Sequence, residues 1–241
     1  MPSKDAGEPL IWERLERPPR GPQPSLSHEA IVRAAIEIAD GEGLEGVTMR
    51  RLAAHLDAGT MSLYRYVSRK DDLIELMVDQ VTGELLPAAP SGDWRADLAA
   101  SARTARRVAL RHPWSAPLLS TGRPSMSPNQ LRLIEQFMTC LDGLGLDVDG
   151  MLDLVTTVQS FVMGVVQGEL AEEEARRRSG ETVEEFRTRM APYLERVLAT
   201  GEHPWLERII IEAEDFPDPD VVFERRLGYV LDGLDRRVSG R

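Results

Sequence analysis

One short stretch constrains the fold of this chain more than any other: residues 47–70, VTMRRLAAHLDAGTMSLYRYVSRK. Its first half predicts a short helix, because Thr48 is a good N-cap and apolar residues follow at helical spacing. These are Leu52, Ala53 and Leu56. Asp57 and Gly59 then interrupt the pattern, since Asp tolerates and Gly freely adopts the left-handed backbone of a tight turn. Residues 60–67 predict a second short helix.

Two short helices joined by such a turn are typical of a helix-turn-helix, whose second helix enters the DNA major groove. The net charge of −11 opposes phosphate binding by the chain as a whole. Within residues 47–70, however, five basic residues accompany a single acidic one, Asp57. The basic residues are Arg50, Arg51, Arg65, Arg69 and Lys70. Positive charge is therefore local to the stretch that would contact DNA.

The composition is that of a soluble globular protein, with 42% hydrophobic and 29% charged residues in 241. No apolar run approaches the eighteen or so residues of a membrane span, and the N-terminus lacks a signal-peptide core. The single cysteine, Cys140, fits a reducing cytoplasm. Its apolar neighbours favour packing over a redox or ligand role. We therefore expect a cytoplasmic protein with no membrane partner.

Residues 1–24 combine prolines with charge and predict an extended arm. Either Arg17 and Arg20 follow the DNA, or the segment is a solvated tail with Ile11 and Trp12 docked on the body.

A DNA-binding domain is expected over residues 25–86. Ser27 is a fair N-cap for a first helix that ends near Gly41 and Gly43. A fourth helix is expected from Ser68 to about Leu86. Its N-terminus would bring unpaired N–H groups close to Lys70, a suitable arrangement for binding phosphate.

The clearest break in the chain is 87–92, PAAPSG, which separates this domain from a second one over residues 93–241. Patterns beyond the break are helical, with no strand alternation of note, so the fold class is all-α. The expected helices are 93–111, a short one with Leu118 and Leu119, 129–144, 148–174, 182–199 and 219–237. His-Pro-Trp occurs twice, at 112–114 and 203–205, each time where a helix should end.

Together these features resemble the tetracycline-repressor (TetR) family of bacterial regulators. The resemblance is close over residues 27–85 and is carried by four motifs, with the RHPW of 111–114 and the MGVVQG of 163–168 extending it into the second domain. The four motifs are Ala34-Ala35, TMRRLA at 48–53, SLYRYV at 62–67 and KDDL at 70–73. Asp57 stands where the family usually has Gly, and we expect the turn to survive because Asp tolerates that backbone.

The resemblance implies that Thr60, Met61 and Ser62 face the DNA bases. Thr60 and Ser62 can donate or accept hydrogen bonds, and Met61 offers apolar contact to a thymine methyl group. Arg50 would reach a base edge or a phosphate.

Tyr64 and Tyr66 would hydrogen-bond phosphates and fix the register, and Lys70 would bind a phosphate from the fourth helix. Arg65 would point either inward or toward the DNA backbone.

The family also implies a homodimer, because two heads bind a palindromic double-stranded operator about one DNA turn apart. The expected interface is a four-helix bundle of the 148–174 helix and the last helix, through apolar stripes on each. These are Met151, Leu154, Val155, Val158, Phe161, Val162 and Val165, and Phe223, Leu227, Val230, Leu231 and Leu234. Gly164 and Gly168 either allow close approach of the partner or make room for a ligand.

A small-molecule effector is expected between the remaining helices, in an apolar pocket with a few polar groups. Candidate contacts are His112, Trp114, Met126, Phe137, Gln159, Phe161, Met163 and Gln167. An effector that prefers the non-DNA-binding conformation would release a repressor from its operator.

The alternative is a helical small-molecule-binding protein or enzyme without DNA binding. The four histidines lack metal-ligand spacing, and no phosphate-binding loop or nucleophile elbow occurs, so no catalytic residue, metal or cofactor is expected.

Overall fold

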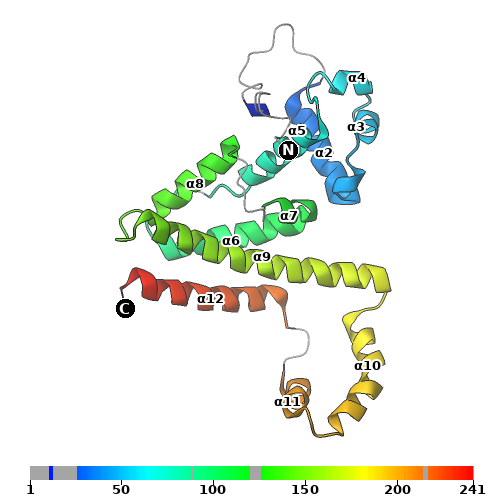
Figure 1. Cartoon of the computed structure of the whole chain (residues 1–241), viewed down its shortest axis with the longest axis vertical. Helices are drawn as coiled ribbons and strands as arrows, with labels where there is room; N and C mark the ends of the chain where they lie inside the picture. Colours follow the sequence, from blue (N-terminus) through cyan, green and yellow to red (C-terminus); the bar gives the residue numbers. More distant parts are fainter. Residues whose placement is uncertain (1–10, 13–25, 88, 120–125, 214–216, 241) are drawn as a thin grey trace, which may run out of the picture.

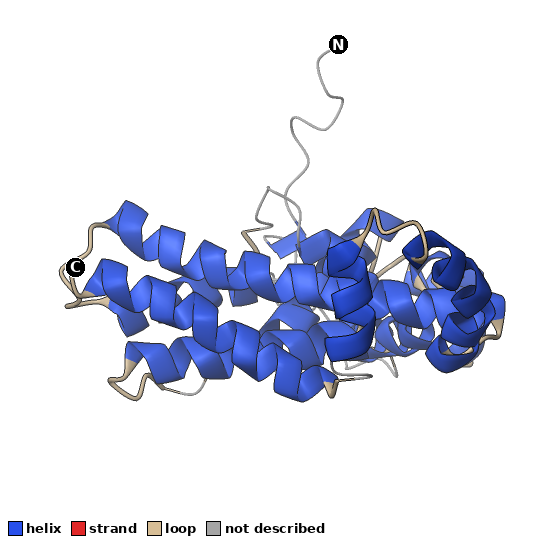
Figure 2. Ribbon diagram, turned by 90° about the horizontal axis from the view of Figure 1, so that it is seen from below, coloured by secondary structure: helices blue, strands red, loops and turns tan. Residues whose placement is uncertain are grey.

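The computed structural model describes residues 11–12, 26–87, 89–119, 126–213 and 217–240. Over these residues the chain is helical and has no β-strand, which confirms the all-α prediction (Figure 2). Three parts are distinguished below (Figure 1): the head is α2 to α5, the body is α6 to α9 with α12, and the arm is α10 with α11.

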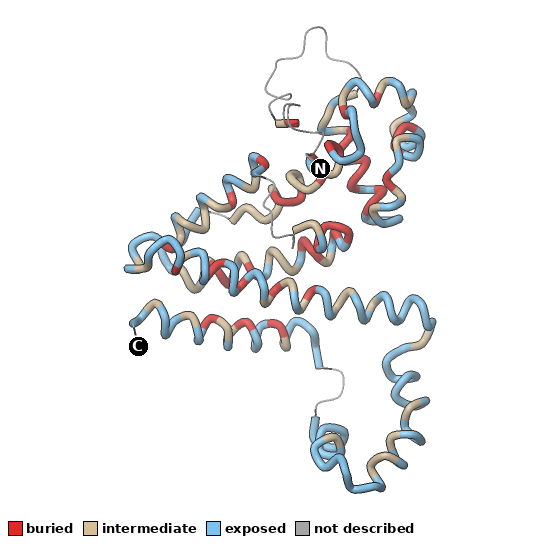
Figure 3. The backbone as a smooth tube through the Cα atoms, viewed as in Figure 1, coloured by how far each residue is buried: buried red, intermediate tan, exposed pale blue. Residues whose placement is uncertain are grey.

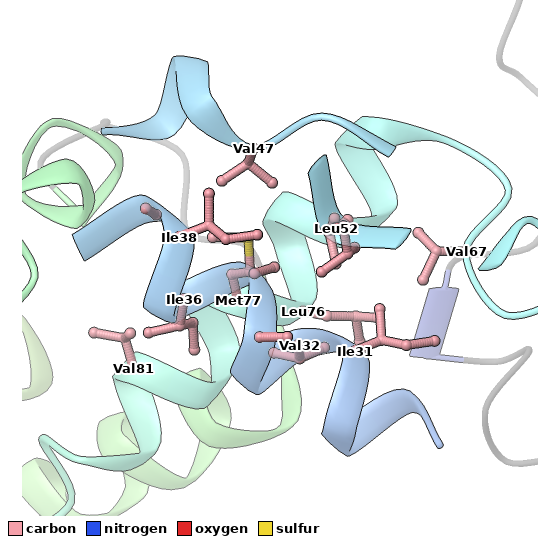
Figure 4. Packing of buried hydrophobic residues seen from close by; sticks show 14 of the residues in the cluster. Ile31, Val32, Ile36, Ile38, Val47, Leu52, Val67, Leu76, Met77 and Val81 are labelled. Atoms are coloured by element: carbon pink, nitrogen blue, oxygen red, sulfur yellow. The ribbon is translucent and has the colours of Figure 1, made fainter. Parts of the chain in front are cut away.

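The head consists of short helices around one apolar core. Its elements are α2 (His28–Glu42), the 3₁₀ turn η1 (Leu44–Gly46), α3 (Met49–His55), α4 (Thr60–Leu63) and α5 (Lys70–Gly83). Side chains from all four α-helices meet in this core, including the fully buried Ile31, Leu52, Leu63 and Met77. Figure 4 shows Ile31, Leu52 and Met77 among them. The predicted caps are confirmed: Ser27 Oγ accepts from the N–H of Ala30, and Thr48 Oγ1 from that of Arg51, both at 3.1 Å.

Two boundaries in the head differ from the prediction. The fourth helix begins at Lys70, with Arg69 and not Ser68 in the N-cap position, and the Arg69 side chain makes no capping hydrogen bond. It ends at Gly83, three residues before the expected Leu86, and single-turn hydrogen bonds continue to Leu86. Residues 1–10 and 13–24 of the expected N-terminal arm, including Arg17 and Arg20, lie outside the described residues. Ile11 is buried against the head core and Trp12 packs beside it.

The body is a second helical layer with its own core. It contains α6 (Trp94–Arg111), the 3₁₀ turn η2 (Pro113–Ser115), α7 (Ala116–Leu119), α8 (Pro128–Leu141), α9 (Val148–Ser179) and α12 (Pro219–Val238). The long helix α9 contacts α6, α8 and α12, and α8 also packs against α5 of the head. The expected helix over 93–111 begins at Trp94, and Asp93 is its N-cap, because Asp93 Oδ1 accepts from the N–H groups of Arg95 and Ala96.

The apolar stripes expected at a dimer interface lie largely inside one chain. Leu154, Val155, Val158 and Val162 of α9 and Phe223, Leu227 and Leu231 of α12 are all buried in the body core. The α9 and α12 helices pack on each other within the chain (Figure 3), and both also pack on α6. The stripes are therefore covered by contacts within one chain.

The prediction that no apolar run approaches the length of a membrane span is wrong for helix α9. It contains an 18-residue window with a mean hydropathy of 1.2, enough by length and composition alone to cross a bilayer. Its most apolar face packs on the body core, as expected for the central helix of a globular domain.

The arm projects from the far end of α9 (Figure 1). It contains α10 (Val183–Leu198) and α11 (Pro204–Glu212), neither of which has a buried residue. Helix α11 is missing from the sequence-based prediction, which took His203-Pro204-Trp205 as a helix end. Proline is favoured in the first helical turn, where its missing N–H has no intrahelical partner, so Pro204 starts α11 instead.

Candidate DNA-binding surface and effector cavity

The turn between α3 and α4 accommodates Asp57 in a left-handed conformation, with φ 49°. The chain closes around it through a hydrogen bond from the N–H of Ala58 to the carbonyl of Ala53 at 2.9 Å. The expectation that the turn survives without glycine is therefore confirmed.

The recognition segment, residues 60–67, is less helical than predicted. Helix α4 covers only Thr60–Leu63, whereas a helix to Val67 was expected. Beyond Leu63 the N–H groups of Tyr66 and Val67 both turn to the Leu63 carbonyl, at 2.9 and 3.0 Å. Aromatic and β-branched residues lose side-chain freedom in a helix, which favours this tighter turn over a further helical turn.

The side chains expected to face bases lie on the outside of this segment. Leu63 and Val67 are fully buried and anchor it to the head core. Met61 is 77% exposed, an unusual position for a large apolar side chain, and Thr60 and Ser62 are half-buried beside it. Met61 therefore points away from the core and not into it.

The two tyrosines occupy different environments. Tyr64 is 47% exposed and open to a partner. Tyr66 is half-buried: its ring meets that of His28 edge-on with centroids 5.2 Å apart, and its carbonyl lies 3.1 Å from His28 Nε2. His28 thus ties the end of the recognition segment to the start of α2.

The five basic residues divide into two groups. Arg51 Nη2 lies 2.6 Å from Glu42 Oε1, a contact that lowers the pKa of Glu42, and Arg69 pairs with Asp72 at 3.3 Å. The others, Arg50, Arg65 and Lys70, are exposed and have no ion-pair partner among the residues that the structure describes. Arg65 thus points outward, which resolves the alternative of an inward position.

An apolar cavity of about 40 Å³ lies in the body between α6, α8 and α9, close to the end of α5. Two of the eight predicted effector contacts line it: Phe137 in the wall, and Gln159, which is exposed and lies at the rim. The remaining wall is Leu85, Leu98, Ser101, Ala102, Ala105, Leu133, Val155, Val158 and Val162.

The other six candidates lie elsewhere. His112 and Trp114 are buried at the contact between head and body, where both lie 2.8 Å from Asp40 Oδ1. Phe161 stacks on Phe223 of α12 with centroids 5.6 Å apart. Met126 is 55% exposed just before α8, Met163 packs against the body core and Gln167 is exposed on α9.

The cavity residues that were missed are aliphatic or small. In the sequence they cannot be distinguished from core residues. Leucine, alanine and valine at helical spacing predict burial, whether the side chain fills the core or lines a cavity. Three of them, Ser101, Ala102 and Ala105, do share one face of α6 with little bulk, and that was the available signal.

Comparisons with known proteins place this geometry in one family. Residues 31–77 match the family of bacterial regulatory proteins named tetR, and residues 86–238 match the tetracyclin repressor-like C-terminal domain. The transcriptional repressor DrrR1 of Streptomyces coeruleorubidus is 40% identical over 235 residues, which cover 96% of this chain and 86% of that protein.

Two solved structures share the fold and more than a quarter of the aligned residues. ActR from Streptomyces coelicolor, in complex with actinorhodin, has a TM-score of 0.69 at 28% identity, covering 89% of this chain and 99% of ActR. BioQ with its double-stranded DNA operator has a TM-score of 0.53 at 27% identity, covering 65% of this chain and 93% of BioQ. The chain therefore belongs to the TetR family and is a ligand-responsive, DNA-binding transcriptional repressor.

Proposed function

We propose that this repressor acts as a homodimer, which holds a palindromic operator with its two heads and leaves it when a small molecule enters the body cavity. One observation carries the DNA-binding part of this proposal. Arg50, Arg65 and Lys70 are exposed and unpaired among the described residues, around a protruding Met61, in a chain whose net charge is −11. Unpaired cations on an otherwise acidic protein suit phosphate contact.

We assign the recognition segment two kinds of contact. Thr60, Met61 and Ser62 face the bases, where hydroxyls and a flexible apolar side chain can distinguish base edges. Tyr64, Tyr66 and Lys70 bind phosphates and fix the register, while Arg50 and Arg65 reach a phosphate or base edge from either side. Tyr66 is half-buried, so less of its side chain is available to a phosphate than in Tyr64.

The dimer requires faces that remain exposed in one chain. On α9 such a face runs through Leu152, Thr156, Ser160, Gly164 and Gly168, four residues apart each time and all exposed. A Cβ added at Gly164 or Gly168 would meet no atom within 4 Å, so nothing in the same chain requires glycine there. Small residues on one helix face let a second backbone approach closely. This favours partner contact as the role of the two glycines.

Further apolar surface for a partner lies on α12 and the arm. Tyr229 of α12 is 67% exposed, and Trp205 and Ile211 of the arm are 70% and 74% exposed. Large exposed apolar side chains of this kind can be covered by a second subunit, as at protein–protein contacts.

The effector site is assigned to the cavity, with Phe137 and Gln159 as contacts. Its walls are apolar, which suits a hydrophobic ligand with a few polar groups. ActR binds actinorhodin, so we use this compound as the first candidate ligand. The proposal includes no catalytic residue, metal or cofactor. It places the protein in the cytoplasm, with residues 25–86 as the DNA-binding domain and 93–241 as the domain for ligand and dimer.

DNA binding at two salt concentrations tests the proposed function. Fluorescence anisotropy with the DNA that flanks the gene of this protein should show specific binding. Affinity should fall at least about tenfold between 50 and 200 mM salt, because several phosphate contacts release counterions. A variant with Arg50, Arg65 and Lys70 all changed to Ala is the matched loss-of-charge control. Binding that ignores both salt and these three changes would refute the proposal.

A further inference from the structure

Helix α5 belongs to both parts of the molecule. Leu73, Met77 and Val81 on one side of it are fully buried in the head core. Leu85, two residues beyond its end, lines the body cavity. Any displacement of the second half of α5 is therefore carried into the head through a packed core, which transmits small shifts because it contains few voids.

A single residue of α8 holds α5 by three hydrogen bonds. The N–H of Asn129 donates to Asp79 Oδ1 at 2.8 Å, and Asn129 Nδ2 donates to Asp79 Oδ2 and to the Asp79 carbonyl, both at 3.0 Å. Gly83 lies one turn further along α5, where an added Cβ would come 3.0 Å from Asn129 Nδ2. Asn129 is thus fixed on α5 by polar contacts and by close approach.

The same face of α8 continues into the cavity. Asn129, Leu133 and Phe137 are spaced four residues apart and so lie on one side of the helix. Leu133 and Phe137 form part of the cavity wall. The attachment to α5 and the far end of this wall are therefore separated by about 12 Å along one continuous helix, at about 1.5 Å per residue.

The cavity is too small to accept an effector without movement of its walls. Its volume is about 40 Å³, whereas sites for small molecules occupy roughly 300 Å³ or more. Binding must therefore displace α6, α8 or α9. Helix α8 has room to move at its start, since a hollow of about 480 Å³ lies beside Asp79, Pro128 and Asn129.

We propose that Asn129 is a positioning residue that converts expansion of the cavity into movement of α5, and thus of the DNA-binding head. An effector pushes Leu133 and Phe137 outward, α8 shifts as a unit, and the bonds from Asn129 to Asp79 draw α5 with it. This inference rests on the proposed function, because it takes the cavity as the effector site. It predicts that losing the Asn129 side chain, which removes two of the three hydrogen bonds and leaves the main-chain one, weakens the coupling of the cavity to the head without removing either function.

The test is a double-mutant cycle that needs no identified effector. Ala105→Phe fills the cavity from α6, and Ser101→Phe does so from the preceding turn of the same helix. DNA affinity is measured by anisotropy on the operator for each filling variant, alone and together with Asn129→Ala. Glu135→Ala, an exposed change on the same helix away from the cavity, is the matched control for Asn129→Ala. Thermal unfolding by circular dichroism verifies that every variant is folded.

A filling substitution should weaken operator binding at least about tenfold, within the 5- to 150-fold range usual for allosteric coupling. With Asn129→Ala the same substitution should cost less than about threefold, while Asn129→Ala alone leaves operator affinity within about threefold. The reciprocal exchange of Asp79→Asn with Asn129→Asp recreates a donor–acceptor pair and should restore part of the coupling. A residue that merely stabilises the fold would show no such restoration.

Two outcomes overturn the inference and differ from failure of the proposed function. Equal losses with and without Asn129→Ala would show that another contact carries the signal. No loss from either filling variant, with both folded, would show that the cavity does not govern the head. If the unmodified protein binds no operator, the proposed function itself fails.

Discussion

Nδ1 of His112 lies 2.8 Å from Oδ1 of Asp40, so that the residue after α6 is joined to the last turn of α2. The indole N–H of Trp114 donates to the same oxygen at 2.8 Å. Both donor side chains are buried, with 4% and 8% of their surface exposed. One carboxylate thus connects the head to the body through two donors.

Asp40→Ala should therefore destabilise the whole chain. It leaves two buried donors without a partner, each of which costs about 1–3 kcal/mol, so we expect a loss of about 2–6 kcal/mol. Urea unfolding at one fixed protein concentration measures it. The control is Glu37→Ala, on the same helix as Asp40. It removes an exposed contact with His55 of α3 and should cost less than about 1 kcal/mol. Equal effects of the two changes would show that the buried donors find other partners.

The turn at Asp57 gives a second prediction about stability. Its φ of 49° is costly for residues with a Cβ, less so for Asp and least for Gly. Asp57→Ala should lower the free energy of unfolding by about 1 kcal/mol, whereas Asp57→Gly should leave it unchanged or raise it by a similar amount. Thermal unfolding ranks the three proteins. An alanine variant as stable as the glycine variant would contradict the strain.

Local sequence signals predicted the head well because its boundaries depend on local chemistry. Ser27 and Thr48 cap helices through their own side chains, and Asp57 forms the turn through its own backbone preference. The end of α4 was wrong because the pattern of apolar residues continues to Val67 although the backbone hydrogen bonds change.

The body was less predictable, since it depends on which apolar face meets which. Leu154 and Phe223 have the periodicity of an interface between subunits, yet both are buried within one chain. His112 and Trp114 look like pocket residues in sequence, and only the approach of Asp40 from the head reveals their structural contacts. No pattern in one chain reports a contact between residues 72 or 74 positions apart.

Cys140 leads to a prediction about pH. Its Sγ lies 3.6 Å from Asp97 Oδ2, and burial together with the negative charge of Asp97 raises the pKa of the thiol to about 11. The thiolate is the reactive form, so alkylation by iodoacetamide at pH 8 should be at least about 100-fold slower than for free cysteine, and should accelerate up to pH 11. Asp97→Asn removes the charge and should speed the reaction at pH 8. A rate that levels off below pH 9 would show an unperturbed thiol.

The exposed face of α9 predicts how the dimer can be separated. Gly164→Gln introduces no clash within one chain, because a Cβ there meets no atom within 4 Å. Replacing a helical glycine should even stabilise α9, by up to about 1 kcal/mol. The bulkier side chain would nevertheless keep a second backbone away, so sedimentation velocity should show a shift from dimer to monomer. Gly41→Gln, an equally open helical glycine in the head, should remain dimeric. A dimeric Gly164→Gln variant would remove this face from the interface.

The recognition segment predicts different effects for residues that bind phosphates and residues that read bases. Tyr64→Ala should weaken binding to every sequence by a similar factor, because an exposed phenol that contacts a phosphate carries no sequence information. Ser62→Ala and Thr60→Val should instead change the order of preference among operators with single base changes, by about 1–3 kcal/mol at the affected position. Binding to a panel of single-substitution operators separates the two patterns.

Tyr64→Phe, which removes only the hydroxyl, shows whether that group makes the phosphate contact. A uniform loss from all of these changes would refute the division of roles, and a shift in preference from Tyr64→Ala would place the tyrosine among the bases.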